Sequence, residues 1–231
     1  MGKNPYSALP KSAFWKTGVA QENPYEIKNI YGLVDGSQEE LETIQNYLKP
    51  AKSKLLLWDD ANEDKIKDLN LKNFKIIHFA THGELAGTIE GQNEPFLVLT
   101  PPNIGTKKND GLLTMSEIMN LENNAELVIL SACNTAGGNI KQSEGFSGLA
   151  RAFLFSGSKS VLVSNWYVET FAAMELTTGM IKEIKNNSKI TTSKALSLSM
   201  KSFIKNNDKK SHPFYWAPFV IVGLNSNISL N

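Results

Sequence analysis

Cysteine and arginine are almost missing from this chain of 231 residues, which has one of each. With Cys133 alone, neither an internal disulfide nor a cysteine-based zinc site can form. With Arg151 alone, a cluster of arginines that binds phosphate in bidentate fashion is excluded as well. An unpaired thiol is typical of a reducing compartment, so the sequence predicts a cytoplasmic protein without a bound metal.

The chain also lacks an excess of charge and any long apolar run. Its 24 basic and 23 acidic residues give a net charge of +1, so no overall field attracts nucleic acid or anionic lipid. No apolar stretch approaches the roughly 18 residues of a membrane-spanning helix, and no signal-peptide pattern begins the chain. Glycine-rich phosphate-binding motifs are absent too. We therefore expect no direct nucleic acid binding, no membrane and no cofactor.

What the chain does contain is an alternation of short apolar segments with polar helical ones. Strands are predicted at 31–34, 54–58, 74–80, 96–100, 126–132, 159–166 and 219–223. Helices are predicted at 37–48, 60–70, 115–121, 145–156, 169–187 and 190–206. This order favours an α/β fold whose mostly parallel sheet is covered by helices on both faces.

The composition and pattern predict one folded domain. Hydrophobic residues make up 41% and charged residues 20%, as in ordinary globular proteins. Residues 1–18 carry two prolines and no clear period, so we interpret them as an N-terminal arm or the remnant of an upstream segment. Residues 19–231 form the predicted domain, without an internal linker or repeat.

Local signals mark several boundaries and give two histidines structural roles. Thr114 and Glu117 form a predicted capping box, and Gly157 supplies a left-handed end for the helix before it. His78 lies within a predicted strand, which favours a buried structural residue. His212 precedes a proline, which favours a turn or a cap.

Two reactive side chains directly follow predicted strands. His82 comes after the strand at 74–80, and Cys133 after the strand at 126–132. Since the carboxyl ends of parallel strands meet at one edge of a sheet, imidazole and thiol are predicted to face each other if the strands are neighbours. The imidazole can then take the thiol proton or lower the thiol pKa from its usual value of about 8.5. This is the arrangement of a cysteine nucleophile and its base.

The spacing of the pair and a neighbouring glycine favour the same chemistry. The separation of 133 − 82 = 51 residues is close to the roughly 50 residues between His and Cys in caspases. The N–H groups of Gly83 and Cys133 can form an oxyanion hole. Taken singly, each side chain has a simpler explanation, because a lone cysteine is most often a small buried residue and a lone histidine a satisfied polar group.

Five blocks of sequence occur along the chain in this order: HFATHGELAG (78–87), DGLLTMSEI (110–118), LVILSACNTAGG (127–138), EGFSGLARAFLFSGSKSVLVSNWYV (144–168) and HPFYWAPFVIVG (212–223). Together they closely resemble the CHAT domain, which belongs to the caspase-like cysteine peptidases that also include separase. The resemblance covers roughly residues 19–223 and implies a caspase-like three-layer sandwich.

The resemblance implies a cysteine endopeptidase that cleaves a protein or peptide through an acyl-enzyme. The catalytic histidine falls on His82, the nucleophile on Cys133, and the oxyanion donors on the amides of Gly83 and Cys133. CHAT domains usually follow TPR or other helical repeats in longer chains, so we also expect a TPR-type or other regulatory domain or chain. The alternative is a catalytically silent CHAT interaction module that binds a peptide or regulatory partner in the same crevice.

The sequence departs from the resemblance at the substrate pocket. Many relatives have an acidic residue at the end of a W-x-V-x-D stretch, where this chain has Thr170. Glu169, Asp110 and Glu144 are the carboxylates left as candidate pocket residues for a basic P1 side chain. Glu169 has an alternative role as the cap of the helix that follows it. An uncharged P1 residue stays open as well.

Overall fold

The computed structural model contains a central sheet with strand order β1-β5-β6-β7. The strands are β1 (Ile76–Phe79), β5 (Leu127–Leu130), β6 (Ser160–Ser164) and β7 (Phe219–Gly223). The first three run parallel, whereas β7 is antiparallel to β6, so the predicted mostly parallel sheet is confirmed. The residues described are 34–49, 51–89, 91–102, 105–106, 108–131, 143–166 and 168–230. The arm predicted at 1–18 lies outside them.

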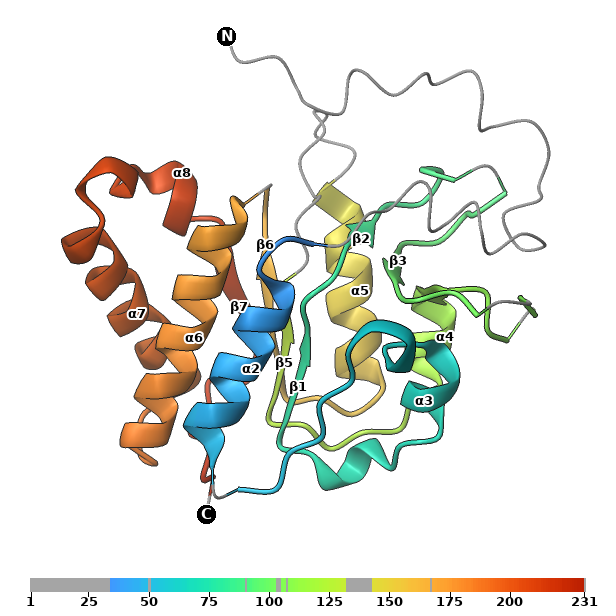
Figure 1. The fold of residues 1–231 in the computed structure, drawn as a ribbon, viewed down its shortest axis with the longest axis horizontal. Coiled ribbons are helices and arrows are strands. Elements are labelled where there is room, and N and C mark those ends of the chain that lie inside the picture. Colours follow the sequence, from blue (N-terminus) through green and yellow to red (C-terminus); the bar gives the residue numbers. More distant parts are fainter. Residues whose placement is uncertain are drawn as a thin grey trace, which may run out of the picture.

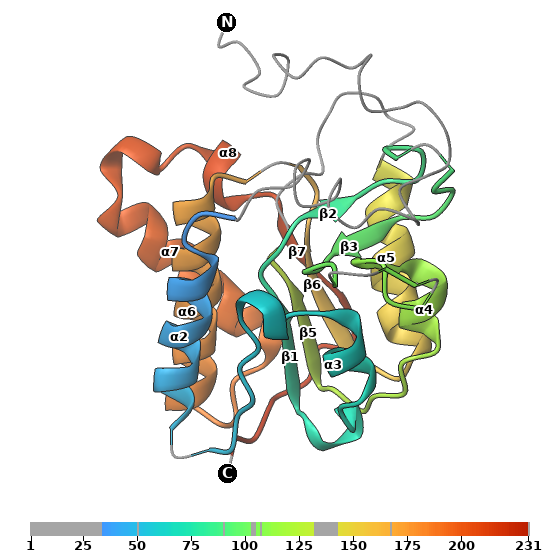
Figure 2. The same cartoon turned by 45° about the vertical axis from the view of Figure 1, so that its right-hand side comes forward.

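Helices cover both faces of this sheet and complete a three-layer α/β sandwich (Figures 1 and 2). The helices on one side are α2 (Ser37–Leu48), α6 (Thr170–Asn186) and α7 (Thr192–Asn206). Those on the other are α3 (Glu63–Lys67), α4 (Met115–Met119) and α5 (Ser143–Phe155). A short helix, α8 (Pro213–Trp216), leads into β7.

Strand side chains alternate between two cores, as the pleat of a β-strand requires. In β5, Val128 and Leu130 pack in the core that contains Phe153 of α5. Leu127 and Ile129 pack in the opposite core, with residues of α2, α6 and α7. All four are at most 1% exposed, which explains why the sequence of this strand is apolar without a break.

A second, antiparallel sheet of three strands was not predicted. Its order is β2-β3-β4, with β2 (Gly83–Glu84), β3 (Phe96–Val98) and β4 (Leu112–Thr114). These strands are too short to show a period of two in the sequence, although β3 lies within a predicted strand. Ile89, Phe96, Val98 and Leu112 form a separate small core there. Its first strand, β2, begins four residues after β1 ends at Phe79, so this sheet helps to position the residues between the two strands.

The strand predicted at 54–58 is wrong. Residues 54–57 have no strand assignment, and Trp58 begins a 3₁₀ turn with a positive φ of 54°. An apolar run favours a buried strand, but the run forms a strand only when another strand lies beside it and pairs with its backbone by hydrogen bonds. Instead, this segment and β1 line the same cavity. The helix predicted at 60–70 is also shorter than expected, because Asn62 caps it just before Glu63.

The predicted boundary signals are confirmed. Thr114 and Glu117 form a reciprocal capping box at the start of α4. Gly157 has a φ of 117°, and a Cβ at this position would lie 2.0 Å from the carbonyl oxygen of Asn123. His212 caps α8, because its Nδ1 accepts a hydrogen bond from the Phe214 amide. Within the described ranges, no helix is long and apolar enough to cross a membrane.

Candidate active site

The carboxyl ends of β1 and β5 lie side by side at one edge of the central sheet. The register pairs Phe79 with Leu130, and the Ser131 amide donates a hydrogen bond of 2.9 Å to the Phe79 carbonyl. The two strands are therefore neighbours in the sheet, which is the condition on which the predicted pairing of His82 and Cys133 depends. In the sequence, His82 comes three residues after Phe79, and Cys133 comes three residues after Leu130. Cys133 itself lies outside the described residues.

The second sheet holds the backbone at His82. The Val98 amide donates a hydrogen bond of 2.8 Å to the His82 carbonyl, and the Thr81 hydroxyl donates to the Val98 carbonyl. β2 begins at the next residue, Gly83, which is buried and pairs with Leu97. The candidate base is thus fixed between two sheets, which restricts where its ring can lie.

The ladder pattern also determines the direction of the Gly83 N–H. Hydrogen-bonded and non-hydrogen-bonded pairs alternate along an antiparallel ladder. The bond from Val98 to the His82 carbonyl makes those two residues a bonded pair. Gly83 and Leu97 are then the next, non-bonded pair. The Gly83 N–H therefore points away from β3, as an oxyanion donor requires.

Glu169 caps α6 and forms an ion pair. Its carboxylate accepts a hydrogen bond of 3.3 Å from the Ala172 amide and lies 2.9 Å and 3.0 Å from Lys210 Nζ. A carboxylate at this end of a helix also interacts favourably with the helix dipole. The cap considered as the alternative role is therefore present, and a basic substrate side chain would have to compete with Lys210.

Asp110 lies in a buried polar cluster against α3. Its Oδ1 accepts a hydrogen bond of 2.9 Å from the Leu112 amide. The Asp110 and Gly111 amides donate in turn to Glu63 Oε2, at 2.8 Å and 2.7 Å. Glu63 is fully buried and pairs with Lys67 at 2.7 Å. Burial raises the pKa of the Asp110 carboxyl to about 6 and also raises the pKa of Glu63. The cluster fastens the Asp110 loop to α3.

Glu144 is the third candidate pocket carboxylate. It belongs to the first turn of α5, but its side chain lies outside the described part of the chain. The structure therefore places His82 and Gly83 just beyond the end of β1, which lies beside the end of β5, and it gives Glu169 and Asp110 partners of their own.

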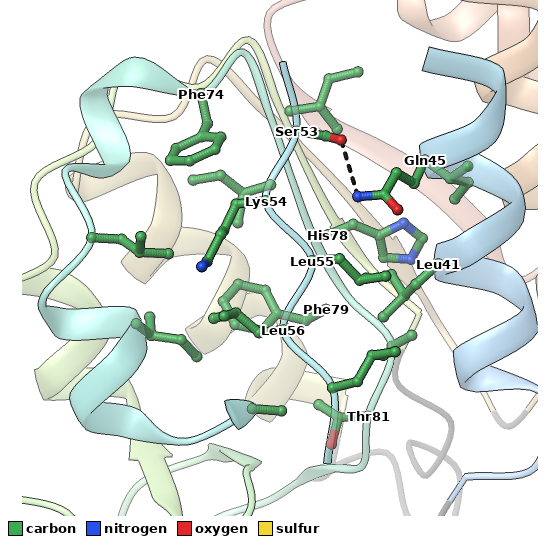
Figure 3. Close-up of a pocket in the computed structure, with 18 of the residues that line it drawn as sticks. Leu41, Gln45, Ser53, Lys54, Leu55, Leu56, Phe74, His78, Phe79 and Thr81 are labelled. Atoms are coloured by element: carbon green, nitrogen blue, oxygen red, sulfur yellow. Dashed lines mark hydrogen bonds between the residues drawn. The ribbon is translucent and has the colours of Figure 1, made fainter. Parts of the chain in front are cut away.

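A largely apolar cavity of about 810 Å³ lies beside the candidate site (Figure 3). Its walls come from α2, residues 51–61 and β1, and His82 is among the residues that line it. Figure 3 shows the His78 ring next to Gln45, whose Nε2 donates a hydrogen bond of 3.1 Å to Ser53 Oγ. The volume lies within the range of about 300–1,000 Å³ typical of ligand pockets.

A buried carboxylate near this edge escaped the sequence analysis. Glu40 of α2 is 2% exposed, and its Oε1 lies 3.0 Å from Nε2 of His78 in β1. His78 is buried, as predicted, with a side chain 6% exposed. The available signal was the position of Glu40, four residues before Ile44 on the apolar side of the helix. In the described part of the chain, no three His, Cys, Asp or Glu side chains gather as metal ligands would.

Comparisons with known proteins agree with this architecture. The family model of the CHAT domain matches residues 11–224. Tetratricopeptide repeat protein 28 of Mus musculus is 32% identical over 120 residues, which are 52% of this chain and 5% of the mouse protein. The Homo sapiens protein of the same name is 26% identical over 188 residues, or 70% of this chain and 7% of the human protein. The chain therefore corresponds to a small part of these relatives. With a family match over nearly its whole length and a caspase-like α/β sandwich, the chain belongs to the CHAT domain family.

Proposed function

We propose that this chain is a cysteine endopeptidase in which His82 activates the thiol of Cys133. The parallel pairing of β1 and β5 carries this proposal. Because Phe79 and Leu130 are register partners, the loops that carry His82 and Cys133 leave neighbouring positions on one sheet edge. A thiol nucleophile needs a base within reach of its proton, and adjacent parallel strands supply that arrangement.

In this mechanism the His82 imidazole takes the proton of the Cys133 thiol, and the thiolate attacks the carbonyl carbon of the scissile peptide bond. The N–H groups of Gly83 and Cys133 donate to the oxyanion of the tetrahedral intermediate. The imidazolium then gives its proton to the leaving amine, and the C–N bond breaks to leave a thioester. Water, deprotonated by the imidazole, attacks the thioester and releases the new carboxyl group with the free thiol. The outward direction of the Gly83 N–H supports its role.

The candidate carboxylates favour an uncharged P1 side chain over a basic one. Glu169 pairs with Lys210, and Asp110 accepts from the Leu112 amide while its pKa is raised by burial. Glu144 remains the third candidate. A basic P1 residue would have to displace Lys210 or reach a carboxylate that is buried and already accepts the Leu112 amide.

A regulatory partner of TPR type is part of the proposal. Both relatives compared above are tetratricopeptide repeat proteins, and this chain matches only a small share of each. The solitary cysteine fits a reducing compartment, and we propose the cytoplasm.

The thiol itself gives a test that needs no known substrate. Because Cys133 is the only cysteine, iodoacetamide alkylation reports on it alone. In the wild type we expect a rate midpoint at least about one pH unit below the usual thiol pKa of about 8.5. His82→Ala should move the midpoint back towards that value. His212→Ala, at an exposed histidine that caps α8, is the matched control and should leave it unchanged.

Cleavage separates the enzyme from the silent binding module. The full chain, with and without a TPR partner, is incubated with a proteome-derived peptide library, and the products are identified by mass spectrometry. Products from the wild type that are missing with Cys133→Ala would establish the peptidase. A slow, ordinary thiol together with no Cys133-dependent products would overturn it in favour of the module.

A further inference from the structure

The Glu40 carboxylate joins three elements of the fold besides its own helix. Its Oε2 accepts a hydrogen bond of 3.1 Å from Ser131 Oγ, at the end of β5. Its Oε1 accepts one of 2.7 Å from Thr177 Oγ1 of α6 and lies 3.0 Å from Nε2 of His78 in β1. Ser131 and Thr177 are buried as well, with 4% and 0% exposure. Both carboxylate oxygens therefore have partners.

These contacts restrict how the two strand ends can move. A buried carboxylate is costly unless its oxygens accept hydrogen bonds, so losing the bond from Ser131 or from Thr177 carries a penalty. Ser131 lies two residues before Cys133, and its amide also bonds to the Phe79 carbonyl. His78 lies four residues before His82. Glu40 thus contacts both strands just before the proposed catalytic residues.

We propose that Glu40 is a positioning residue for the His82–Cys133 pair, a role that rests on the function proposed above. The carboxylate fixes the end of β5 against β1 from the side of α2. Its contacts among the described residues are with Ser131, Thr177 and His78, so we expect it to act through the placement of the two strand ends. Its contact with Thr177 ties it to α6 and serves stability rather than placement.

The test compares iodoacetamide alkylation of Cys133 against pH in variants of the full chain, with thermal melts alongside. Glu40→Gln keeps the size of the side chain but loses one acceptor oxygen. Since a misplacement of about 1 Å can cost roughly a hundredfold in rate, we expect alkylation at neutral pH to fall by about tenfold or more. Ser131→Ala should act in the same direction. Combining both changes should slow the reaction little beyond Glu40→Gln alone, because the two residues share one contact.

Two variants separate placement from stability. Thr177→Ala should lower the melting temperature while leaving the alkylation profile within about twofold of wild type, because α6 carries neither catalytic residue. Glu39→Gln, at the exposed neighbour of Glu40 in the same helix, should change neither quantity. If Glu40→Gln does not fold, Ser131→Ala carries the comparison, since it leaves the other contacts of the carboxylate in place.

The outcomes distinguish the two proposals. A fast wild-type thiol with unchanged profiles in Glu40→Gln and Ser131→Ala would refute the positioning role and leave the peptidase standing. A wild-type thiol that reacts like a model thiol, together with no Cys133-dependent cleavage products, would overturn the proposed function, and the positioning role with it. Slower alkylation of Cys133 in Glu40→Gln and in Ser131→Ala, with Glu39→Gln at the wild-type rate, would establish the positioning role.

Discussion

Replacing Asp110 by asparagine should stabilise the protein at neutral pH and have no effect in acid. The Asp110 side chain is buried against α3, and that burial raises its pKa from 3.8 to about 6. Asparagine keeps the oxygen that accepts the Leu112 amide but carries no charge to desolvate. The substitution therefore removes a cost and retains the hydrogen bond.

The pH dependence of stability follows from the different proton binding of Asp110 in the folded and the unfolded chain. Between pH 4 and pH 6 the folded chain holds a proton on Asp110 that the unfolded chain has lost, so the free energy of unfolding falls as the pH rises. A shift of roughly two pH units corresponds to about 3 kcal/mol at most, at about 1.4 kcal/mol per unit. The full cost is present above the folded pKa, and none remains below the unfolded pKa. Asp110→Asn should thus exceed wild type by about 1–3 kcal/mol at pH 7 and equal it near pH 3.5.

Urea unfolding followed by tryptophan fluorescence at pH 3.5, 5, 6 and 7 measures this difference. The exposed Asp60→Asn, also in the loop region near α3, is the matched control and should stay within about 0.5 kcal/mol of wild type throughout. The reasoning is refuted if Asp110→Asn is less stable than wild type at pH 7. It is equally refuted if the difference between the two proteins does not change with pH.

Two further substitutions probe the core and a turn. Phe153→Ala removes a ring that is 1% exposed and whose centroid lies 5.5 Å from that of Phe79. The substitution should lower the free energy of unfolding, measured in urea, by about 3–5 kcal/mol. A decrease below about 1 kcal/mol would contradict the packing. Gly157→Ala places a Cβ 2.0 Å from the Asn123 carbonyl oxygen and should lower the thermal midpoint far more than Gly87→Ala, which meets only the backbone cost of about 1–2 kcal/mol. Equal midpoints for the two alanine variants would contradict the clash.

The two middle strands of the central sheet, β5 and β6, could be predicted because they are buried on both faces. The run at 127–130 is apolar throughout, and such a run needs two covering layers, which implies helices above and below. His82 could be found because it comes three residues after Phe79, at the end of the apolar run that forms β1. The pairing of β1 with β5 then confirmed the condition on which the candidate site depended.

Glu40 could not be assigned a role in advance, because its partners are remote in the chain. Ser131 is 91 residues away and Thr177 is 137 residues away, so no local pattern links them to the helix at 37–48. The false strand at 54–58 has a related cause, since apolar composition gives no information about whether a neighbouring strand is available. The two-residue strand β2 exists only because Leu97 and Phe96 of β3 lie beside it.

The short passage from one sheet into the other has a mechanical consequence. Only three residues separate the end of β1 at Phe79 from the start of β2 at Gly83, and His82 is the last of them. Leu97 and Leu113 of the small sheet are fully buried in the same core as Val128 and Leu130 of β5. The backbone at the candidate base is therefore held by a sheet on each side, and a partner that displaced the small sheet would disturb the base and this shared core together.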